Sequence, residues 1–247
     1  MRLARIEHGG NPVWAMIEGD ELALIEGDPF GAHQATGERV PLEGATLLCP
    51  VTPTKIVAMA VNYRSHGAPV ETPQPFLKTP SALIGPGQSI VLPPDAGRVD
   101  EEGEVVAVIG RRASRIGAEE VDAHVFGYTC GNDVSAREWQ QDDVQWWRAK
   151  SSDTFAAVGP WVETDLDPEA IAFRARVNGE TVQDAHTSQL VFGVRECVAF
   201  ISQVMTLEPG DIVYTGTPGT TAQLSEGDVV EIEAEGIGVL RNPVVAG

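Results

Sequence analysis

The stretch Glu102-Gly103-Glu104-Val105-Val106-Ala107-Val108-Ile109 places two carboxylates at the start of an apolar run. The apolar residues predict a buried strand, and residues i and i+2 of a strand point to the same face. We therefore expect the oxygens of Glu102 and Glu104 side by side next to the core. Carboxylates that repel each other at low dielectric take up a proton or bind a cation. A solvated acidic surface is the competing interpretation, because most acidic runs are of that kind.

A third carboxylate, Asp133, follows a second strand-like segment farther along the chain. Together with Glu102 and Glu104 it would complete a site made of hard oxygen ligands. Such a site suits Mg²⁺, with Mn²⁺ or Ca²⁺ as alternatives. The three residues therefore predict a divalent-metal centre.

Composition excludes several classes of partner. The chain of 247 residues has 36 acidic and 17 basic residues, a net charge of -19 and a pI near 4.5. Nucleic acid and anionic membranes would repel such a surface. The first residues lack the apolar core of a signal peptide, and the apolar run at 56–61 is too short to span a bilayer, so a cytoplasmic location is expected. The three cysteines are widely spaced and predict no disulfide framework.

Strand signals dominate the chain, as alternating or apolar runs bounded by Gly, Pro and Asn. Two helices are expected, at 134–142 and 194–205, the second with one apolar stripe. Strands are expected at 2–7, 13–18, 21–25, 56–61, 89–92, 105–109, 125–130, 173–177, 180–183, 212–215, 229–233 and 238–241. The pattern predicts a strand-rich α+β protein with a small N-terminal β segment, residues 1–54, and a main domain, residues 55–247.

Short motifs follow one another in a fixed order between Lys55 and Asn242. They include Asn62-Tyr63-Arg64-Ser65-His66, the acidic stretch around Glu102, Asn132-Asp133 through Gln140, Lys150-Ser151-Ser152-Asp153, and Thr215-Gly216-Thr217-Pro218. In this order the motifs are similar to those of the fumarylacetoacetate hydrolase family. The resemblance implies a mixed β-roll or β-sandwich of the type of that family's C-terminal domain, with few helices. It also implies a homodimer.

The resemblance implies that Glu102, Glu104 and Asp133 hold a divalent metal, usually Mg²⁺. Substrates in the family are typically small anionic 2-oxo or β-diketo acids, or their enols, which chelate the metal. Cleavage, decarboxylation or isomerisation of such compounds passes through an enolate, and a metal on the 2-oxo oxygen stabilises that charge.

Further residues acquire expected roles from the same resemblance. Lys150 would place a fixed positive charge near the enolate, whereas alone it would be taken for a solvated lysine. Arg137 and Gln140 lie at i and i+3 and share one helix face, although Arg137 could instead hold a carboxylate in an ion pair. Thr217 is expected to contact substrate, with an ordinary turn as the alternative. Residues expected around the entrance of the site, or else in packing or surface roles, are Tyr63, Arg64 and Lys78.

His66 raises the question of which reaction is catalysed. Hydrolytic members of the family typically place a glutamate three residues after this histidine, and the pair activates water. Here that position is Pro69, which cannot accept a proton from an imidazole. Glu71 is two residues farther on and is the candidate replacement. His66 and Glu71 are therefore candidate catalytic residues whose geometry must decide the matter.

Three functions are consistent with these residues. The first is a metal-dependent hydrolase that cleaves a C–C bond in an acylpyruvate or fumarylacetoacetate-type β-diketo acid. The second is an isomerase or decarboxylase of a 2-oxo or 2-hydroxy-dienedioate of aromatic catabolism, similar to 2-hydroxyhepta-2,4-diene-1,7-dioate isomerase. The third is a metal-binding relative without catalysis. We place the hydrolase first, because the family is broad and Glu71 could take over the missing role.

Overall fold

The computed structural model describes residues 1–68 and 70–247, so the expectation based on Pro69 lies outside the described residues. Strands dominate the fold and form two large sheets and one small one. The larger sheet contains β1 (Arg2–His8), β2 (Asn11–Glu18), β3 (Glu21–Gly27), β4 (His33–Pro41), β5 (Leu47–Leu48), β6 (Ile56–Ala60), β7 (Gln74–Lys78), β8 (Leu83–Ile84), β11 (Gly103–Ile109), β12 (Val125–Asp133), β14 (Ala156–Glu163) and β17 (Ile212–Tyr214).

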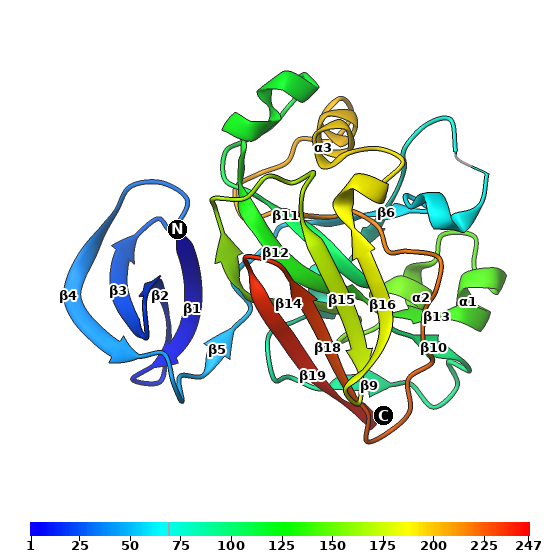
Figure 1. Ribbon diagram of the computed structural model, residues 1–247, viewed down its shortest axis with the longest axis horizontal. Helices are drawn as coiled ribbons and strands as arrows, with labels where there is room; N and C mark the ends of the chain where they lie inside the picture. The colour runs from blue at the N-terminus through cyan, green and yellow to red at the C-terminus, as the bar shows by residue number, and fades with distance from the viewer. Residues whose placement is uncertain (69) are drawn as a thin grey trace.

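The second sheet lies in front of the first in Figure 1, where β15, β18 and β19 cross β11, β12 and β14. It contains β9 (Ile90–Leu92), β15 (Ala172–Val177), β16 (Glu180–His186), β18 (Val229–Ala234) and β19 (Gly238–Ala246). A short pair joins β10 (Val99–Asp100) to β13 (Ser135–Ala136). The helices are α1 (Arg137–Asp142), α2 (Trp147–Ser151), α3 (Val194–Ser202) and the 3-10 turns η1 (Arg64–His66), η2 (Pro80–Ala82), η3 (Ala118–Ala123) and η4 (Thr187–Gln189).

Strand β11 lies at the centre of the larger sheet, antiparallel to β12 on one side and to β17 on the other. Its alternate residues enter two different hydrophobic cores, as expected for a strand buried on both faces. Val105 and Ala107 pack in the core that includes Phe173 of the second sheet. Val106 and Val108 belong to the core on the opposite face. The strand that carries the acidic residues is therefore fixed on every side.

The N-terminal strands β1 to β4 form an antiparallel meander, seen on the left of Figure 1. Strand β1 also pairs with β14 of the main body, at Arg2↔Glu163 and Leu3↔Val162, so the meander extends the larger sheet. The N-terminal ammonium and the Arg2 guanidinium both bind the Glu163 carboxylate, at 2.8 and 3.1 Å. The division of the chain at residue 54 stays a prediction.

The strand-rich α+β fold class is confirmed, and most of the predicted strands are present, often longer at one end. Several details differ. Strand β4 lies where no strand was predicted, and β7, β14 and α2 were not predicted either. The helix expected at 134–142 begins only at Arg137, because Ser135 and Ala136 pair with β10.

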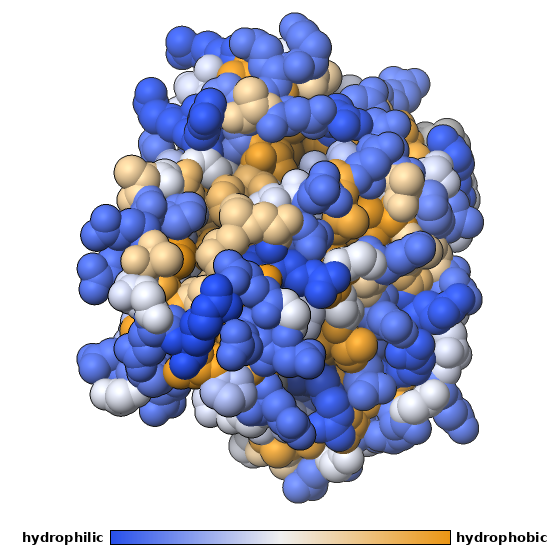
Figure 2. Space-filling view, turned by 60° about the vertical axis from the view of Figure 1, so that its left-hand side comes forward, coloured by the Kyte–Doolittle hydropathy of each residue, from blue (hydrophilic) through white to orange (hydrophobic). Residues whose placement is uncertain are grey.

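Polar residues cover most of the face shown in Figure 2, and hydrophobic residues appear there in small groups. Among the described residues, no helix combines the length and the apolar character needed to cross a membrane.

Candidate metal centre and active site

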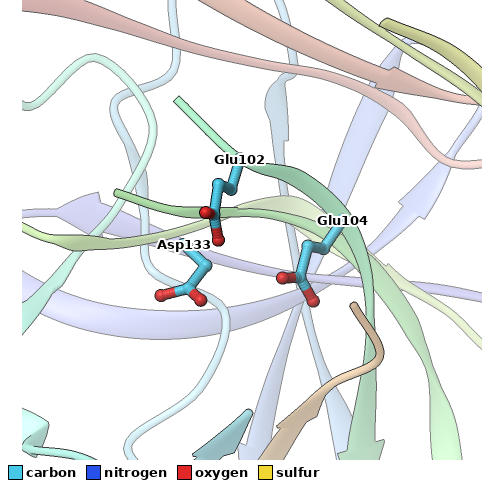
Figure 3. A group of neighbouring side chains, drawn as sticks. All are labelled: Glu102, Glu104 and Asp133. Carbon is cyan, nitrogen blue, oxygen red and sulfur yellow. The ribbon is translucent and has the colours of Figure 1, made fainter. Parts of the chain in front are cut away.

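Three carboxylates converge where β11 begins and β12 ends. Glu104 lies in β11, Glu102 directly precedes that strand, and Asp133 is the last residue of β12. The pairing of Gly103 with Asn132 and the 2.9 Å hydrogen bond from the Asp133 amide to the Glu102 carbonyl set their positions. Figure 3 shows the three carboxyl groups turned toward one another. Each offers an oxygen, and these oxygens lie within 4.8 Å of one another, while all three residues are buried.

Basic side chains surround this carboxylate triad (Glu102, Glu104 and Asp133). The ammonium group of Lys150 donates to Glu102 and to Asp133, in both cases at 2.7 Å. Lys78, which is also buried, donates to the other oxygen of Asp133. Arg137 pairs with Glu102 at 2.6 Å. Glu102 and Asp133 are therefore charge-compensated by the chain itself.

Glu104 is the member of the triad without such compensation among the described residues. Its oxygen accepts a hydrogen bond from the Gly216 amide. Burial, followed by the charges of Asp133 and Glu102, raises the pKa of Glu104 well above its usual value. Burial acts in the same direction on Asp133, but Lys150 and Lys78 outweigh it and hold the pKa of that carboxyl below its usual range. A divalent cation would relieve the repulsion at Glu104, so these hard oxygen donors fit such an ion.

Lys150 reaches the triad from α2, a helix that was not predicted. Burial alone would lower the pKa of Lys150, but the charges of Asp133 and Glu102 outweigh burial and raise it. The side chain therefore stays an ammonium ion. Its nitrogen lies 5.0 Å from the centre of the Phe76 ring, which adds a cation–π contact.

A cavity of about 200 Å³ opens over the triad. It brings together most residues predicted to act in one site, with apolar walls from Met59, Val61, Phe76 and Trp146. The predicted residues that line it are Glu102, Glu104, Asp133, Lys150, Arg137, Gln140, Thr217 and His66. Arg137 and Gln140 do share a face, since the guanidinium donates to the Gln140 amide oxygen at 3.0 Å.

Four predicted residues do not line this cavity. Tyr63 and Arg64 line a neighbouring cavity of about 490 Å³, and Arg64 donates to the Ser188 carbonyl. Lys78 is buried against Asp133 rather than at an entrance. Glu71 is exposed and does not line the triad cavity.

His66 lies at the rim of the cavity on η1. Its Nε2 atom is 2.9 Å from the backbone carbonyl of Thr217. A carbonyl only accepts, so this nitrogen carries the hydrogen. Within residues 1–68 and 70–247, the hydrogen bonds of the His66 ring include none to a carboxylate.

The loop that carries Thr217 is held by residues that the sequence did not reveal as important. The Gln183 amide donates to the Thr217 hydroxyl at 2.8 Å and to the Thr220 carbonyl at 2.7 Å. Asn62 donates to the Thr215 carbonyl at 2.8 Å. Gly216 has φ +110°, a conformation that favours glycine, and its amide binds Glu104. A motif containing Asn62 was visible in the sequence, whereas nothing marked Gln183.

Comparison with known proteins decides the family. Residues 55–245 match the model described as fumarylacetoacetate (FAA) hydrolase C-terminal, and residues 1–50 match one described as Rv2993c-like, N-terminal. The chain belongs to the fumarylacetoacetate hydrolase family.

Three relatives within and around this family carry different activities in their names. The crystal structure of a 5-carboxymethyl-2-hydroxymuconate delta-isomerase from Mycobacterium smegmatis is 45% identical, with a TM-score of 0.96 and 100% of each chain covered. The mitochondrial oxaloacetate tautomerase FAHD2A of Bos taurus is 41% identical over 83% of this chain and 71% of its own length. A maleylpyruvate hydrolase from Sphingobium sp. SYK-6, in complex with manganese (II) ion and pyruvate, is 33% identical, with a TM-score of 0.84 and 100% of each chain covered.

Proposed function

We propose that this protein is a divalent-metal-dependent enzyme that interconverts enol and keto forms of a small 2-oxo acid, as an isomerase or tautomerase. The observation that carries the proposal is the buried carboxylate triad with the Lys150 ammonium fixed between two of its members. The isomerase and the tautomerase among the relatives are 45% and 41% identical to the chain, which supports the same class of reaction.

In this proposal Glu102, Glu104 and Asp133 hold one Mg²⁺ or Mn²⁺. When bound, the metal would act as a Lewis acid on the 2-oxo oxygen. The relative crystallised with manganese (II) and pyruvate makes this a reasonable ion and ligand class. Retention of a charged lysine beside the triad speaks against a metal-binding relative without catalysis.

The other side chains of the cavity have roles in binding and in charge stabilisation. Lys150 supplies a fixed positive charge where the enolate forms, and its side chain is buried, so its charge is weakly screened. Arg137 and Gln140 line the cavity together, and the Arg137 charge and the Gln140 amide would attract the carboxylate of the substrate. The Thr217 hydroxyl accepts from Gln183, so its own hydrogen is free to be donated to the substrate. The reaction moves a proton between the enol oxygen and carbon and needs no oxidant.

Isomerisation is favoured over hydrolysis by the surroundings of His66. In a His–carboxylate pair that activates water, the carboxylate accepts a hydrogen bond from the second ring N–H, which orients the imidazole and stabilises its charged form. The ring is instead bonded to the Thr217 carbonyl, and Glu71 does not line the cavity. Enol–keto interconversion requires no activated water.

Hydrolytic C–C cleavage is the second candidate, and it stays a prediction. One observation favours it: His66 lines the cavity next to the triad, where an imidazole could approach a water molecule. The hydrolase from Sphingobium sp. SYK-6 covers the whole chain at 33% identity.

Homodimerisation, inferred from kinship, likewise stays a proposal that measurement of the molecular mass in solution would test.

Replacement of His66 separates the two candidates. His66→Ala should retain enol–keto interconversion within about tenfold, because metal and Lys150 supply most of the stabilisation. The assay follows loss of enol absorbance and deuterium uptake at carbon from D₂O, with Mg²⁺ and a panel of oxaloacetate, a hydroxy-dienedioate and acetylpyruvate.

The same panel in H₂¹⁸O gives the decisive control. Hydrolysis places solvent oxygen in a newly formed carboxylate, whereas isomerisation creates no such group. Cleavage fragments labelled in this way, together with loss of activity in His66→Ala, would replace the isomerase with the hydrolase.

A further inference from the structure

A second cavity, of about 530 Å³, adjoins the triad cavity and shares His66, Glu102 and Arg137 with it. It therefore borders the site where the 2-oxo end of a substrate would bind. Its other walls come from residues that were given no role above: Arg98, Asp100, Glu138, Gln141, Gly219 and Thr221. The basic residue among these six is Arg98.

The backbone of Arg98 is fixed from both directions. Its carbonyl accepts from the Arg137 amide at 2.8 Å, and its amide donates to the Glu138 carboxylate at 2.6 Å. The next residue, Val99, begins strand β10, which pairs with β13. The Arg98 side chain therefore extends from a backbone that is fixed against the first turn of α1.

The guanidinium of Arg98 is oriented by Asp100, which is 1% exposed. Nε and Nη2 donate to the two oxygens of Asp100 at 2.7 and 3.0 Å. A planar guanidinium that uses this edge presents its other edge, Nη1 and Nη2, away from the carboxylate. The hydrogen bonds of the described residues leave Nη1 without a protein acceptor, and 49% of the side chain is exposed. That free edge matches a second carboxylate in a two-pronged contact.

The charges of the cavity permit an anion. Asp100 is covered by Arg98 and Arg137, and Glu102 is paired with Arg137 and Lys150. Glu138 is the exposed acid that remains, and it accepts the Arg98 amide. Arg137 has its three nitrogens engaged by Asp100, Glu102, Gln140 and Thr221, so it is less available than Arg98.

We propose that Arg98 binds the second carboxylate of a dicarboxylic 2-oxo acid whose 2-oxo end lies at the triad. Arg98 is thereby the residue that selects diacids over monoacids. The proposal rests on the proposed function for the position of the 2-oxo end. Its test, however, measures binding and does not depend on turnover.

The test compares 2-oxoheptanedioate with 2-oxoheptanoate, which share chain length and 2-oxo group, by calorimetry on the Mg²⁺-loaded protein. The wild type should bind the diacid more tightly. Arg98→Gln should weaken diacid binding by about tenfold and leave the monoacid unchanged, since one partly exposed charge-assisted contact is lost. Arg39→Gln is the matched control, because Arg39 is 47% exposed and also paired with carboxylates, but lies in the N-terminal meander.

A second variant acts in the opposite direction. Glu138→Gln keeps an oxygen for the Arg98 amide but removes the remaining negative charge, so diacid affinity should rise while monoacid affinity stays constant. Equal weakening of both acids by Arg98→Gln would indicate a merely structural ion pair and overturn the proposal, as would no change for either acid. If enol–keto interconversion is absent while Arg98 still confers preference for the diacid, the proposed function falls and the assignment of Arg98 stands.

Discussion

The N-terminal meander and the carboxylate triad contain ion pairs of similar lengths in opposite surroundings. In the meander Arg39 bridges Glu18 and Glu21, and all three side chains are about half exposed. At the triad Lys150 bridges Glu102 and Asp133, with side chains at most 8% exposed. Solvent screens the first set, whose contribution to stability is small. The second set has lost its hydration and must be compensated by the protein.

The comparison shows where this chain buries charged groups at a cost in stability. The meander needs only an apolar face, formed by Ala4, Ile6 and Leu22 among others, and its charges are at the surface. The centre buries carboxylates against one another, which stability alone would not favour. Buried, repelling groups in a cavity are typical of functional sites. Variants in the two regions should therefore have effects of very different size.

The largest effect is expected at Glu104, the triad member without a basic partner in the described structure. Glu104→Gln should lower affinity for Mg²⁺ or Mn²⁺ by more than about 100-fold, because even outer partners of metal ligands cost 10- to 100-fold. Without metal the variant should be at least as stable as the wild type, since repulsion with Asp133 and Glu102 is removed. Calorimetric titration measures the metal affinity, and thermal melts with and without metal measure the stability. The exposed Glu226→Gln is the control. Unchanged metal affinity in Glu104→Gln would remove Glu104 from the site.

A smaller effect on the metal but a large one on catalysis is expected at Lys150. Lys150→Met should lower kcat by roughly 100-fold, the scale for loss of one preorganised electrostatic stabiliser. Metal affinity should be largely retained, because the three carboxylates remain. Steady-state rates and metal titration separate the two properties, and Lys150→Arg shows how far charge alone suffices. Full turnover in Lys150→Met would exclude this residue from catalysis.

The smallest effect is expected where the meander meets the main body. Burial would raise the pKa of Glu163, but its hydrogen bonds to the N-terminal ammonium, the Asp165 amide and Arg2 outweigh burial and lower it. A carboxyl with a lowered pKa in the folded state stabilises that state above its unfolded pKa, about 4.3, and the contribution disappears as pH falls through the folded value. Glu163→Gln should thus cost about 1 kcal/mol or less at pH 7.

Urea unfolding of Glu163→Gln at pH 7 and at acid pH provides the measurement, with Glu18→Gln as the exposed control. The difference in the free energy of unfolding between variant and wild type should become smaller as the pH falls. A difference that is constant with pH would assign the effect to packing rather than to charge.

Secondary structure was predicted correctly where a local sequence pattern has a single physical cause. Asn178-Gly179 marks a tight turn, and the hairpin of β15 and β16 surrounds it, with both residues at positive φ. Strand β4 was missed because its residues are nearly all exposed, so no alternation of apolar and polar residues marks it. Strand β14 contains Gly159-Pro160, which reads as a turn although its neighbours are buried.

Prediction of the candidate site was also limited to features that are local in the sequence. Spacing along β11 and the resemblance placed the triad and Lys150 in one site, because strand periodicity is local. Other contacts depend on which strands and loops become neighbours in the fold. They are the hydrogen bonds of Lys78 to Asp133, of Gln183 to Thr217 and of the Arg98 amide to Glu138. Such pairings over long stretches of chain have no signature in a single sequence.

The central position of β11 limits the motion of the triad. Because β12 and β17 hold this strand on both edges, its backbone opens only when the sheet itself opens. Amide hydrogens of Val106 and Val108 should therefore exchange with solvent only through global unfolding, among the slowest in the chain. The conformational entropy cost of bringing the three carboxylates together is therefore incurred when the sheet forms. An ion bound by the triad would find its ligands already in place.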